Sequence, residues 1–365
     1  MGSNKQKRIL IAPLDWGMGH TTRCIPLINL LLKLGHIPVF AGNEWQRTYI
    51  KETFVKIDTV FLEGYNITYP NSINPSKFFI IPIIPSILKT ISNEKKWLDE
   101  NFDKLKIDGI ISDNRYGMHH SKIPSVILTH QLQIQTDCGN RTDLLFQKLH
   151  YKLINKFNCV WVVDSETENN LAGNLSHTYN MPLNYNYIGL LSRFADKGKD
   201  EQNTHAPILI LLSGPEPQRT KLSAKIWEQL QNYKGDVVFV EGADTIKQPI
   251  YLPPNIKYYK WLTHEQLYPL IKTANIVICR SGYSTLMDLV ALNKKAILIP
   301  TPGQTEQVYL AHSLKEKGIY YSMNQIDFNL IEALQNAQQF PFRKMNLEDS
   351  FSIYKKVLID WVEQL

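Results

Sequence analysis

Short apolar runs alternate with amphipathic stretches along both halves of the chain. In the first half, the runs that predict strands lie at residues 8–14, 37–41, 107–112, 125–129 and 159–163. In the second half they lie at residues 208–212, 236–241, 275–279, 296–300 and 319–322. Apolar strands separated by crossover helices are typical of parallel sheets, whose strands are buried on both faces. We therefore predict an α/β protein with a parallel sheet in each half.

The clearest helix is predicted at residues 26–34, where Pro26 suits the first position and Gly35 suits the end. A polar stretch without periodicity at 192–207 predicts a linker. A chain of 365 residues commonly divides into two domains, so we expect domains at residues 1–191 and 208–345. The amphipathic end at 346–365 predicts a helix that packs back on the first domain.

The composition narrows the class of protein without changing the expected fold. Hydrophobic residues make up 44% of the chain and charged residues 20%, which is typical of a globular protein. Four scattered cysteines predict neither a zinc site nor a disulfide framework, and no signal sequence is recognised, so we expect a cytoplasmic protein. The net charge of +6 includes no long basic run. We therefore expect no nucleic-acid partner; an anionic small molecule or a membrane surface fits better.

A strand end, a turn of small residues and a helix start follow one another at residues 279–288. The amides of a helix N-terminus attract phosphate, and Gly282 would let a phosphate approach the backbone closely. Asp288 lies one helical turn after Ser284, where its carboxylate could accept hydrogen bonds from two ribose hydroxyls; the alternative is a surface aspartate. The candidate donor-binding residues of this stretch are Arg280, Ser281, Gly282, Ser284, Thr285 and Asp288.

A second helix start follows the next predicted strand, in residues 299–307. Thr305, Glu306 and Gln307 carry both donors and acceptors there, which is the chemistry that neighbouring hydroxyls of a sugar ring require. The alternative is a capped helix whose polar side chains are solvated.

These segments, with Lys317-Gly318, resemble the C-terminal domain of family 28 glycosyltransferases over about residues 275–318. That family includes the bacterial lipid II-forming N-acetylglucosaminyl transferase. The resemblance implies the GT-B architecture of two facing Rossmann-like domains, a UDP-sugar substrate and no bound cofactor. It places Asp288 on the nucleotide ribose and Glu306-Gln307 on the sugar.

The chain departs from the family pattern in two places. Val308 and Ala311 stand where the lipid II enzyme often has Gln and Asn, so the resemblance does not specify N-acetylglucosamine. The loop after residues 208–212 lacks the usual glycine-rich turn, but its polar atoms could still meet a diphosphate. A later aromatic residue could hold the base or belong to the core. The further donor-binding candidates are Ser213, Gly214, Arg219, Trp261 and Leu262.

The first predicted strand leads into a Gly-x-Gly loop, Gly17-Met18-Gly19, which is followed by His20. The glycines would let the chain turn sharply beside a ligand, and a histidine can take a proton from an acceptor hydroxyl near neutral pH. The loop resembles the N-terminal glycine-rich loop of the same enzymes. His20 is therefore the candidate base; the alternative is a histidine with a structural hydrogen bond.

Asp113 follows the predicted strand at 107–112, at the same edge of the expected sheet as His20. It resembles an aspartate that pairs with a histidine in plant-type natural-product glycosyltransferases. Such a carboxylate would fix the tautomer of the imidazole and stabilise the imidazolium ion. The candidate acceptor-side residues are Gly17, Gly19, Arg115 and His130.

Two further features concern metals and membranes. The sequence contains no Asp-x-Asp and no histidine–carboxylate cluster with ligand spacing, so we expect no metal ion. The apolar stretch at 78–88 contains two prolines and is too short to span a bilayer. Because lysines flank it, the stretch could lie in a membrane interface; the wall of an acceptor pocket or a buried helix explains it equally well.

Together these patterns predict an inverting glycosyltransferase that moves a sugar from a nucleoside diphosphate, expected to be UDP, to an acceptor hydroxyl. The preferred acceptor is a lipid or glycolipid, and the preferred location is the cytoplasm or the inner face of the membrane. A nucleotide-sugar epimerase of the same architecture and a relative that binds without catalysis remain alternatives. A nicotinamide-dependent dehydrogenase would explain Gly17 and Gly19 but not the second half of the chain.

Overall fold

The computed structural model describes residues 5–65, 84–134, 139–197, 206–242 and 252–365. The described residues divide into two compact units. The first unit contains the residues up to Arg193 together with Leu347–Leu365, and the second contains Phe194–Asn346. Each unit has one sheet in which every pair of neighbouring strands is parallel. The predicted α/β class is confirmed.

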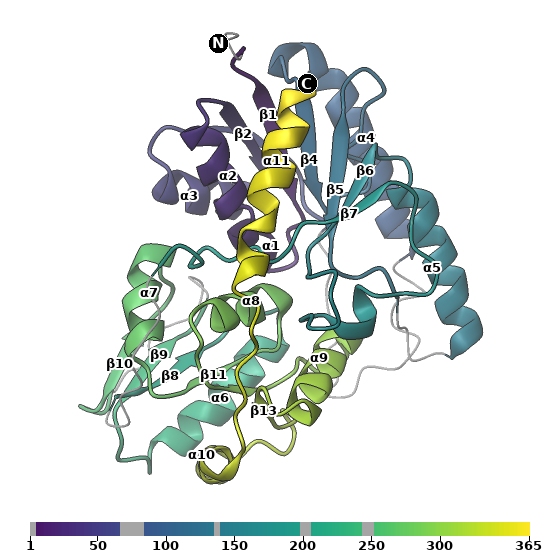
Figure 1. The fold of residues 1–365 in the computed structure, drawn as a ribbon. Helices are drawn as coiled ribbons and strands as arrows, with labels where there is room; N and C mark the ends of the chain where they lie inside the picture. The colour runs from purple at the N-terminus through teal and green to yellow at the C-terminus, as the bar shows by residue number, and fades with distance from the viewer. Residues whose placement is uncertain (1–4, 66–83, 135–138, 198–205, 243–251) are drawn as a thin grey trace. The chain divides into compact units, whose positions relative to one another are not determined.

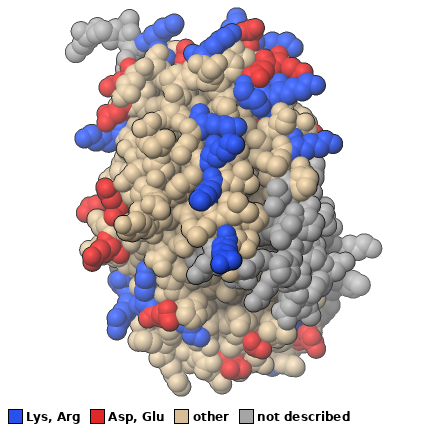
Figure 2. All heavy atoms as spheres, turned by 90° about the vertical axis from the view of Figure 1, so that its right-hand side faces the viewer, with Lys and Arg blue, Asp and Glu red and all other residues tan. Residues whose placement is uncertain are grey.

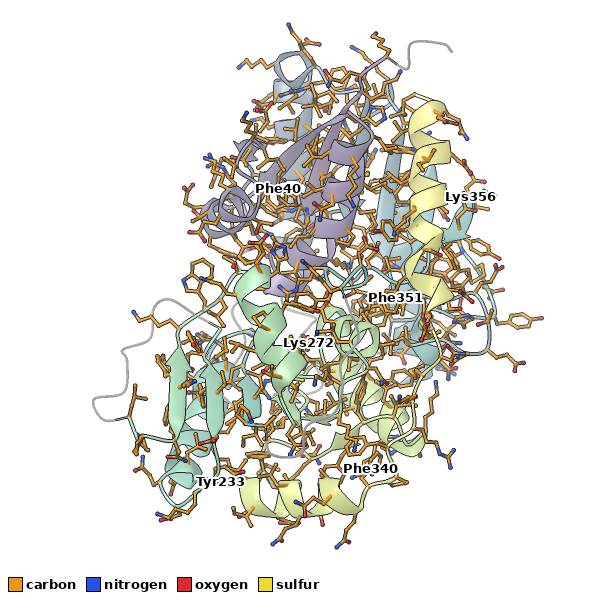
Figure 3. The ribbon with its side chains drawn as sticks, turned by 60° about the vertical axis from the view of Figure 1, so that its left-hand side comes forward. Phe40, Tyr233, Lys272, Phe340, Phe351 and Lys356 are labelled. Carbon is orange, nitrogen blue, oxygen red and sulfur yellow. The ribbon has the colours of Figure 1, made fainter. Side chains whose placement is uncertain are left out.

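The sheet of the first unit has seven strands in the order β3-β2-β1-β4-β5-β6-β7 (Figure 1). Its strands are β1 (Arg8–Pro13), β2 (Ile37–Gly42), β3 (Asp58–Phe61), β4 (Gly109–Asp113), β5 (Ser125–Thr129), β6 (Cys159–Val162) and β7 (Tyr185–Tyr187). Residues of the central strands β4 and β5 are all buried, as expected for interior parallel strands. Figure 3 shows Phe40, which is fully buried, within this sheet.

The α-helices of the first unit are α1 (Met18–Arg23), α2 (Ile25–Lys33), α3 (Glu44–Thr53), α4 (Ile84–Leu105), α5 (Asn140–Ile154) and α11 (Ile353–Glu363), with short 3₁₀ helices at Gly173–Leu175 and Asp349–Phe351. Helix α11 comes from the C-terminal end of the chain and lies alongside the first sheet (Figure 1). Trp361 of α11 packs edge to face on Trp161 of β6, with ring centroids 5.6 Å apart. The opposite face of α11 carries Lys356, which is exposed (Figure 3).

The sheet of the second unit has six strands in the order β10-β9-β8-β11-β12-β13. Its strands are β8 (Ile208–Leu211), β9 (Val237–Val240), β10 (Ile256–Tyr259), β11 (Val277–Cys279), β12 (Ala296–Leu298) and β13 (Tyr321–Ser322). Its helices are α6 (Gln218–Leu230), α7 (His264–Thr273), α8 (Tyr283–Ala291), α9 (Thr305–Glu316) and α10 (Leu330–Gln339). The apolar faces of α6 and α10 join the strands in one core that includes Leu222, Phe239 and Ala333.

The stretch at 78–88 lies mostly outside the described residues, and only its end forms the start of α4. Within the ranges that the structure describes, no helix is both long and apolar enough to cross a bilayer.

Candidate active site

The carboxyl ends of β1, β4 and β5 lie side by side in the first sheet, because β4 pairs with β1 on one side and with β5 on the other. The chain after β1 stays close to β4, since the amide of Leu14 donates to the main-chain carbonyl of Asp113 at 2.9 Å. His130 follows β5 directly. Polar residues from three distant segments therefore meet at one edge of the sheet.

Helix α1 carries His20 to this edge. Gly17 precedes the helix with a φ of 82°, a conformation that residues other than glycine rarely adopt. A Cβ at this position would have no atom within 4 Å, so there is room for a side chain. Glycine is needed here because of the positive φ angle. Gly19 lies inside α1, where its carbonyl accepts a hydrogen bond from the Thr22 hydroxyl at 3.2 Å.

His20 and Asp113 are in contact. Nδ1 of His20 lies 3.1 Å from Oδ1 of Asp113, and the Asp113 side chain is fully buried. The imidazole is 16% exposed, and none of the hydrogen bonds found for the described part of the chain uses its Nε2 atom. The two candidates for proton transfer are thus placed together, with one imidazole nitrogen facing the carboxylate.

Arg23 is a member of this cluster that the sequence analysis missed. Its side chain is 1% exposed, and its Nε donates to Oδ2 of Asp113 at 2.5 Å while one Nη donates to Oδ1. The other Nη lies 3.1 Å from Nδ1 of His130. Residues three apart share a helical face, so the spacing from His20 was the signal that could have identified it.

The charges around His20 favour its neutral form. Burial is the largest influence and lowers the pKa of the imidazole below 6.5; Asp113 opposes this effect and Arg23 adds to it. Burial alone would raise the pKa of Asp113, but the charges and hydrogen bonds of Arg23 and His20 outweigh burial and hold that pKa well below its usual range. At neutral pH the pair is therefore a neutral imidazole and a carboxylate.

Arg115 is fully buried beneath the same edge. Its guanidinium donates to the carbonyls of Pro13 and Glu63, each at 2.8 Å, and to Oε1 of Glu94 at 3.1 Å. These contacts tie the segments after β1 and β3 to helix α4. The arginine thus supports the loops around the site, and its side chain is not exposed to an acceptor.

At the carboxyl edge of the second sheet, the loops after β8 and β12 approach each other. Gly214 has a φ of 103°, and a Cβ built on it would lie 3.5 Å from the Thr301 hydroxyl. Helix α8 begins at the same edge, after β11, and a Cβ on its capping residue Gly282 would meet nothing within 4 Å. The space beside the N-terminus of α8 is therefore open, as an approaching phosphate requires.

The two arginines among the donor candidates are engaged within the protein. Arg280 is 1% exposed and donates to the carbonyls of Ile299, Pro300 and Gln218 at 2.8–3.3 Å. Arg219 is paired with Glu216 and lies 3.8 Å from Glu241. Both side chains therefore hold the loops at this edge together.

Other donor candidates contact one another. The Ser281 hydroxyl donates to the carbonyl of Gln307 at 2.7 Å, and the Gln307 amide oxygen accepts from the amide of Thr301 at 3.0 Å. Asp288 is 5% exposed, so it is not a surface aspartate. The half-buried candidates are Ser213, Gly214, Trp261, Gly282, Ser284, Thr285, Thr305 and Glu306, whereas Leu262 is buried just before α7.

Among the residues that the structure describes, no group of three or more histidine, cysteine or acidic side chains is arranged to hold a metal ion.

Comparison with known proteins relates this chain to glycosyltransferases. Residues 196–356 match the glycosyltransferase family 28 C-terminal domain. An uncharacterised glycosyltransferase of Methanosarcina acetivorans is 22% identical over 330 residues, which are 85% of this chain and 84% of the relative.

A second relative is a UDP-N-acetylglucosamine–N-acetylmuramyl-(pentapeptide) pyrophosphoryl-undecaprenol N-acetylglucosamine transferase of Elusimicrobium minutum. It is 35% identical over 80 residues, which are 21% of this chain and 22% of that enzyme. The solved structure of the glycosyltransferase SnogD from Streptomyces nogalater superposes with a TM-score of 0.61 at 14% identity, over 99% of this chain and 100% of SnogD. At this identity the likeness shows the fold, which is GT-B.

Proposed function

We propose that this chain, whose residues 196–356 match the glycosyltransferase family 28 C-terminal domain, transfers a sugar from UDP to an acceptor hydroxyl with inversion. The observation that carries the proposal is the contact between His20 and the fully buried Asp113 at the carboxyl edge of the first sheet. The relative whose name includes a UDP-sugar supports the choice of nucleotide.

The proposed donor site lies at the carboxyl edge of the second sheet. The N-terminus of α8, with open space beside Gly282, would receive the diphosphate through main-chain amides. Asp288, one turn into α8, would accept hydrogen bonds from the ribose, and Glu306 at the start of α9 would bind sugar hydroxyls. Arg219 and Arg280 bind other groups of the protein. The negative charge of the leaving diphosphate would therefore be stabilised mainly by the dipole and amides of helix α8.

The proposed reaction begins with proton transfer to His20. Nδ1–H of the imidazole donates to Asp113, which leaves the lone pair of Nε2 to take the proton of the acceptor hydroxyl. The hydroxyl oxygen forms a bond to the anomeric carbon while the bond to the UDP oxygen breaks, and the electron pair leaves with UDP. A single displacement of this kind inverts the anomeric configuration.

A lipid-linked acceptor at the cytoplasmic face of a membrane completes the proposal. Helix α5 exposes Leu144 and Leu145, which are 56% and 68% exposed, beside the exposed Lys148. Figure 2 shows Lys and Arg side chains along the middle of the face on which α5 lies, and a mixture of basic and acidic side chains near its upper edge. Apolar side chains among basic ones suit an anionic membrane surface. Binding to vesicles that contain anionic lipid should fall in the Leu144→Ser/Leu145→Ser variant, and unchanged binding would remove this part of the proposal.

The function is tested by supplying a panel of UDP-sugars with and without a lipid extract and following UDP release and products by NMR. We expect UDP release that depends on the extract and a product anomer opposite to that of the donor. A changed sugar or free UDP without any acceptor would identify an epimerase instead. Donor binding without turnover in any extract would favour the relative that binds without catalysis, and retention of configuration would contradict the single displacement.

A further inference from the structure

Arg23 contacts three other polar side chains at this edge of the first sheet, namely His20, Asp113 and His130. Its Nε and one Nη bind the two oxygens of Asp113 as a fork, and the other Nη lies 3.1 Å from Nδ1 of His130. A planar guanidinium that binds a carboxylate through two parallel hydrogen bonds fixes the orientation of that carboxylate. Arg23 therefore holds side chains that follow β4 and β5 from a position on α1.

The fork also bears on the tautomer of His20. Nδ1 of His20 lies 3.0 Å from an Nη of Arg23 and 3.1 Å from Oδ1 of Asp113. The carboxylate can only accept and the guanidinium can only donate, so Nδ1 cannot satisfy both neighbours at once. An Nδ1 that bears the proton pairs with Asp113 and leaves Nε2 as a base, whereas a bare Nδ1 would accept from Arg23 and place the proton on Nε2.

The fork holds Oδ1 of Asp113 within reach of the imidazole, and one N–H of the Nη nearest to His20 is donated to that oxygen. The same Nη keeps a second N–H, so it is the orientation of the carboxylate, and not the lack of a donor on Arg23, that favours a protonated Nδ1. We propose that Arg23 is a positioning residue, which orients Asp113 so that His20 keeps its proton on Nδ1 and presents an unprotonated Nε2. This inference takes its catalytic meaning from the proposed function, but the placement of the proton can be measured without it.

Among the residues that the structure describes, the charged groups and histidines that face His20 belong to β4, to α1 and to the segment after β5. Asp113 ends β4 and favours the imidazolium ion; Arg23 on α1 and His130 after β5 disfavour it. A further titratable neighbour is the buried thiol of Cys24, whose Sγ donates to the carbonyl of His20 at 3.3 Å. Burial raises the pKa of this thiol well above its usual value, so it stays neutral. Loss of the Arg23 cation would leave Asp113 unopposed, and the midpoint for protonation of His20 should then rise.

The test is a titration of the histidine side chains by ¹H–¹⁵N NMR together with the pH dependence of kcat. We expect Arg23→Met to raise the protonation midpoint of His20 by at least about one pH unit, as for an imidazole beside an unopposed carboxylate. The acid limb of the kcat profile should move to higher pH by the same amount. Arg23→Lys keeps a cation but cannot form the two parallel hydrogen bonds to Asp113, so the protonation midpoint of His20 should move less than in Arg23→Met. The kcat should still fall about tenfold or more, and the KM for the donor should stay unchanged.

The control variant is Arg115→Met, which also removes a fully buried guanidinium from this unit but one that does not contact His20. An equal rise of the His20 midpoint in this variant would show a general effect of lost buried charge and overturn the proposal. So would an Nε2–H tautomer in the unmodified protein, or an unchanged midpoint in both Arg23 variants. If Arg23→Met does not fold, the test rests on Arg23→Lys, in which the expected fall in kcat is measured. The titration needs no substrate, so a failure to find sugar transfer would leave its result standing.

Discussion

Nδ1 of His20 lies 3.1 Å from Oδ1 of Asp113, although 93 positions separate the two residues in the sequence. The contact depends on the parallel pairing of β1 with β4, which brings Pro13 opposite Asp113. Helix α1, which follows β1, then places His20 at the edge of the sheet where both strands end. The fold thus forms a histidine–carboxylate pair from two segments that are far apart in the sequence.

Replacement of His20 by alanine should reduce kcat by about a hundredfold to ten-thousandfold, the usual contribution of a general base. Donor affinity should stay within about twofold, because the proposed donor contacts belong to the second unit. Steady-state kinetics with calorimetry of UDP binding would measure both. A suitable control is His36→Ala, since His36 is buried before β2 at the other edge of the sheet. A near-normal kcat for the His20 variant would point to another base, such as His130.

Asp113→Asn should move the acid limb of the rate profile to lower pH. The aspartate raises the pKa of His20 against the lowering by burial and Arg23, so its loss leaves the imidazole neutral at still lower pH. The plateau rate should also fall, though less than in His20→Ala, because the amide orients the imidazole less well. The buried Arg23 loses its counter-charge, at a cost of about 3–5 kcal/mol in stability. A limb that moves to higher pH would contradict this electrostatic account.

Sequence patterns predicted the interior strands of both sheets, but of the edge strands they predicted only β13. Strands such as β4 and β5 are buried on both faces, so their apolar runs are continuous and visible. The edge strands β3, β7 and β10 were not predicted, because they are short and partly exposed and mix polar residues with apolar ones. Burial on one face only leaves a weaker signal in a strand of three or four residues.

For the candidate site, sequence reasoning identified His20 and Asp113 but not Arg23. A motif search finds residues that follow strands, whereas Arg23 acts from the end of a short helix. In the second unit the same reasoning assigned Arg219 to the donor from its charge, and Arg280 from its place in the stretch that resembles family 28 glycosyltransferases. The structure shows both guanidinium groups engaged by neighbouring loops, and only tertiary contacts could reveal that.

Asp288→Asn should weaken binding of UDP-sugars about tenfold to a hundredfold, because hydrogen bonds to a charged group contribute about 1.5–3 kcal/mol. The substitution preserves the shape of a side chain that is 5% exposed, so the fold should survive. Calorimetry with UDP would give the affinity, and the exposed Glu316 of α9 offers a control as Glu316→Gln. Unchanged affinity for every uridine nucleotide that binds the unmodified protein would eliminate the ribose assignment.

Transfer should continue in the presence of EDTA. The chain contains no Asp-x-Asp sequence, and the open N-terminus of α8 can stabilise the leaving diphosphate through its amides. Initial rates with EDTA, and after re-addition of magnesium or manganese, would decide the matter. Loss of turnover that a metal ion restores would contradict the proposed charge stabilisation.

The stability of the first unit should decrease between pH 5 and pH 8 because of Glu94. Burial raises the pKa of this carboxyl from 4.5 to about 7, against the opposing effects of Arg115 and the Gly117 amide. A carboxyl whose pKa is raised by folding contributes its full stability below the unfolded pKa and loses that contribution as pH rises through the folded pKa. The rise from 4.5 to about 7 corresponds to roughly 3 kcal/mol at most.

The Glu94→Gln variant separates this effect from other titrations. A glutamine resembles the protonated carboxyl and can still accept from the Gly117 amide, which donates to Glu94 at 2.9 Å. Urea unfolding should therefore show a smaller loss of stability from pH 5 to pH 8 in the variant than in the unmodified protein. Asp99→Asn, on the exposed face of the same helix, should leave the pH dependence as it was, since Asp99 is 49% exposed and its ion pair with Lys95 is screened by solvent. An identical pH dependence in Glu94→Gln and the unmodified protein would mean that the Arg115 cation keeps Glu94 ionised throughout this range, and that the pair outweighs the cost of burial.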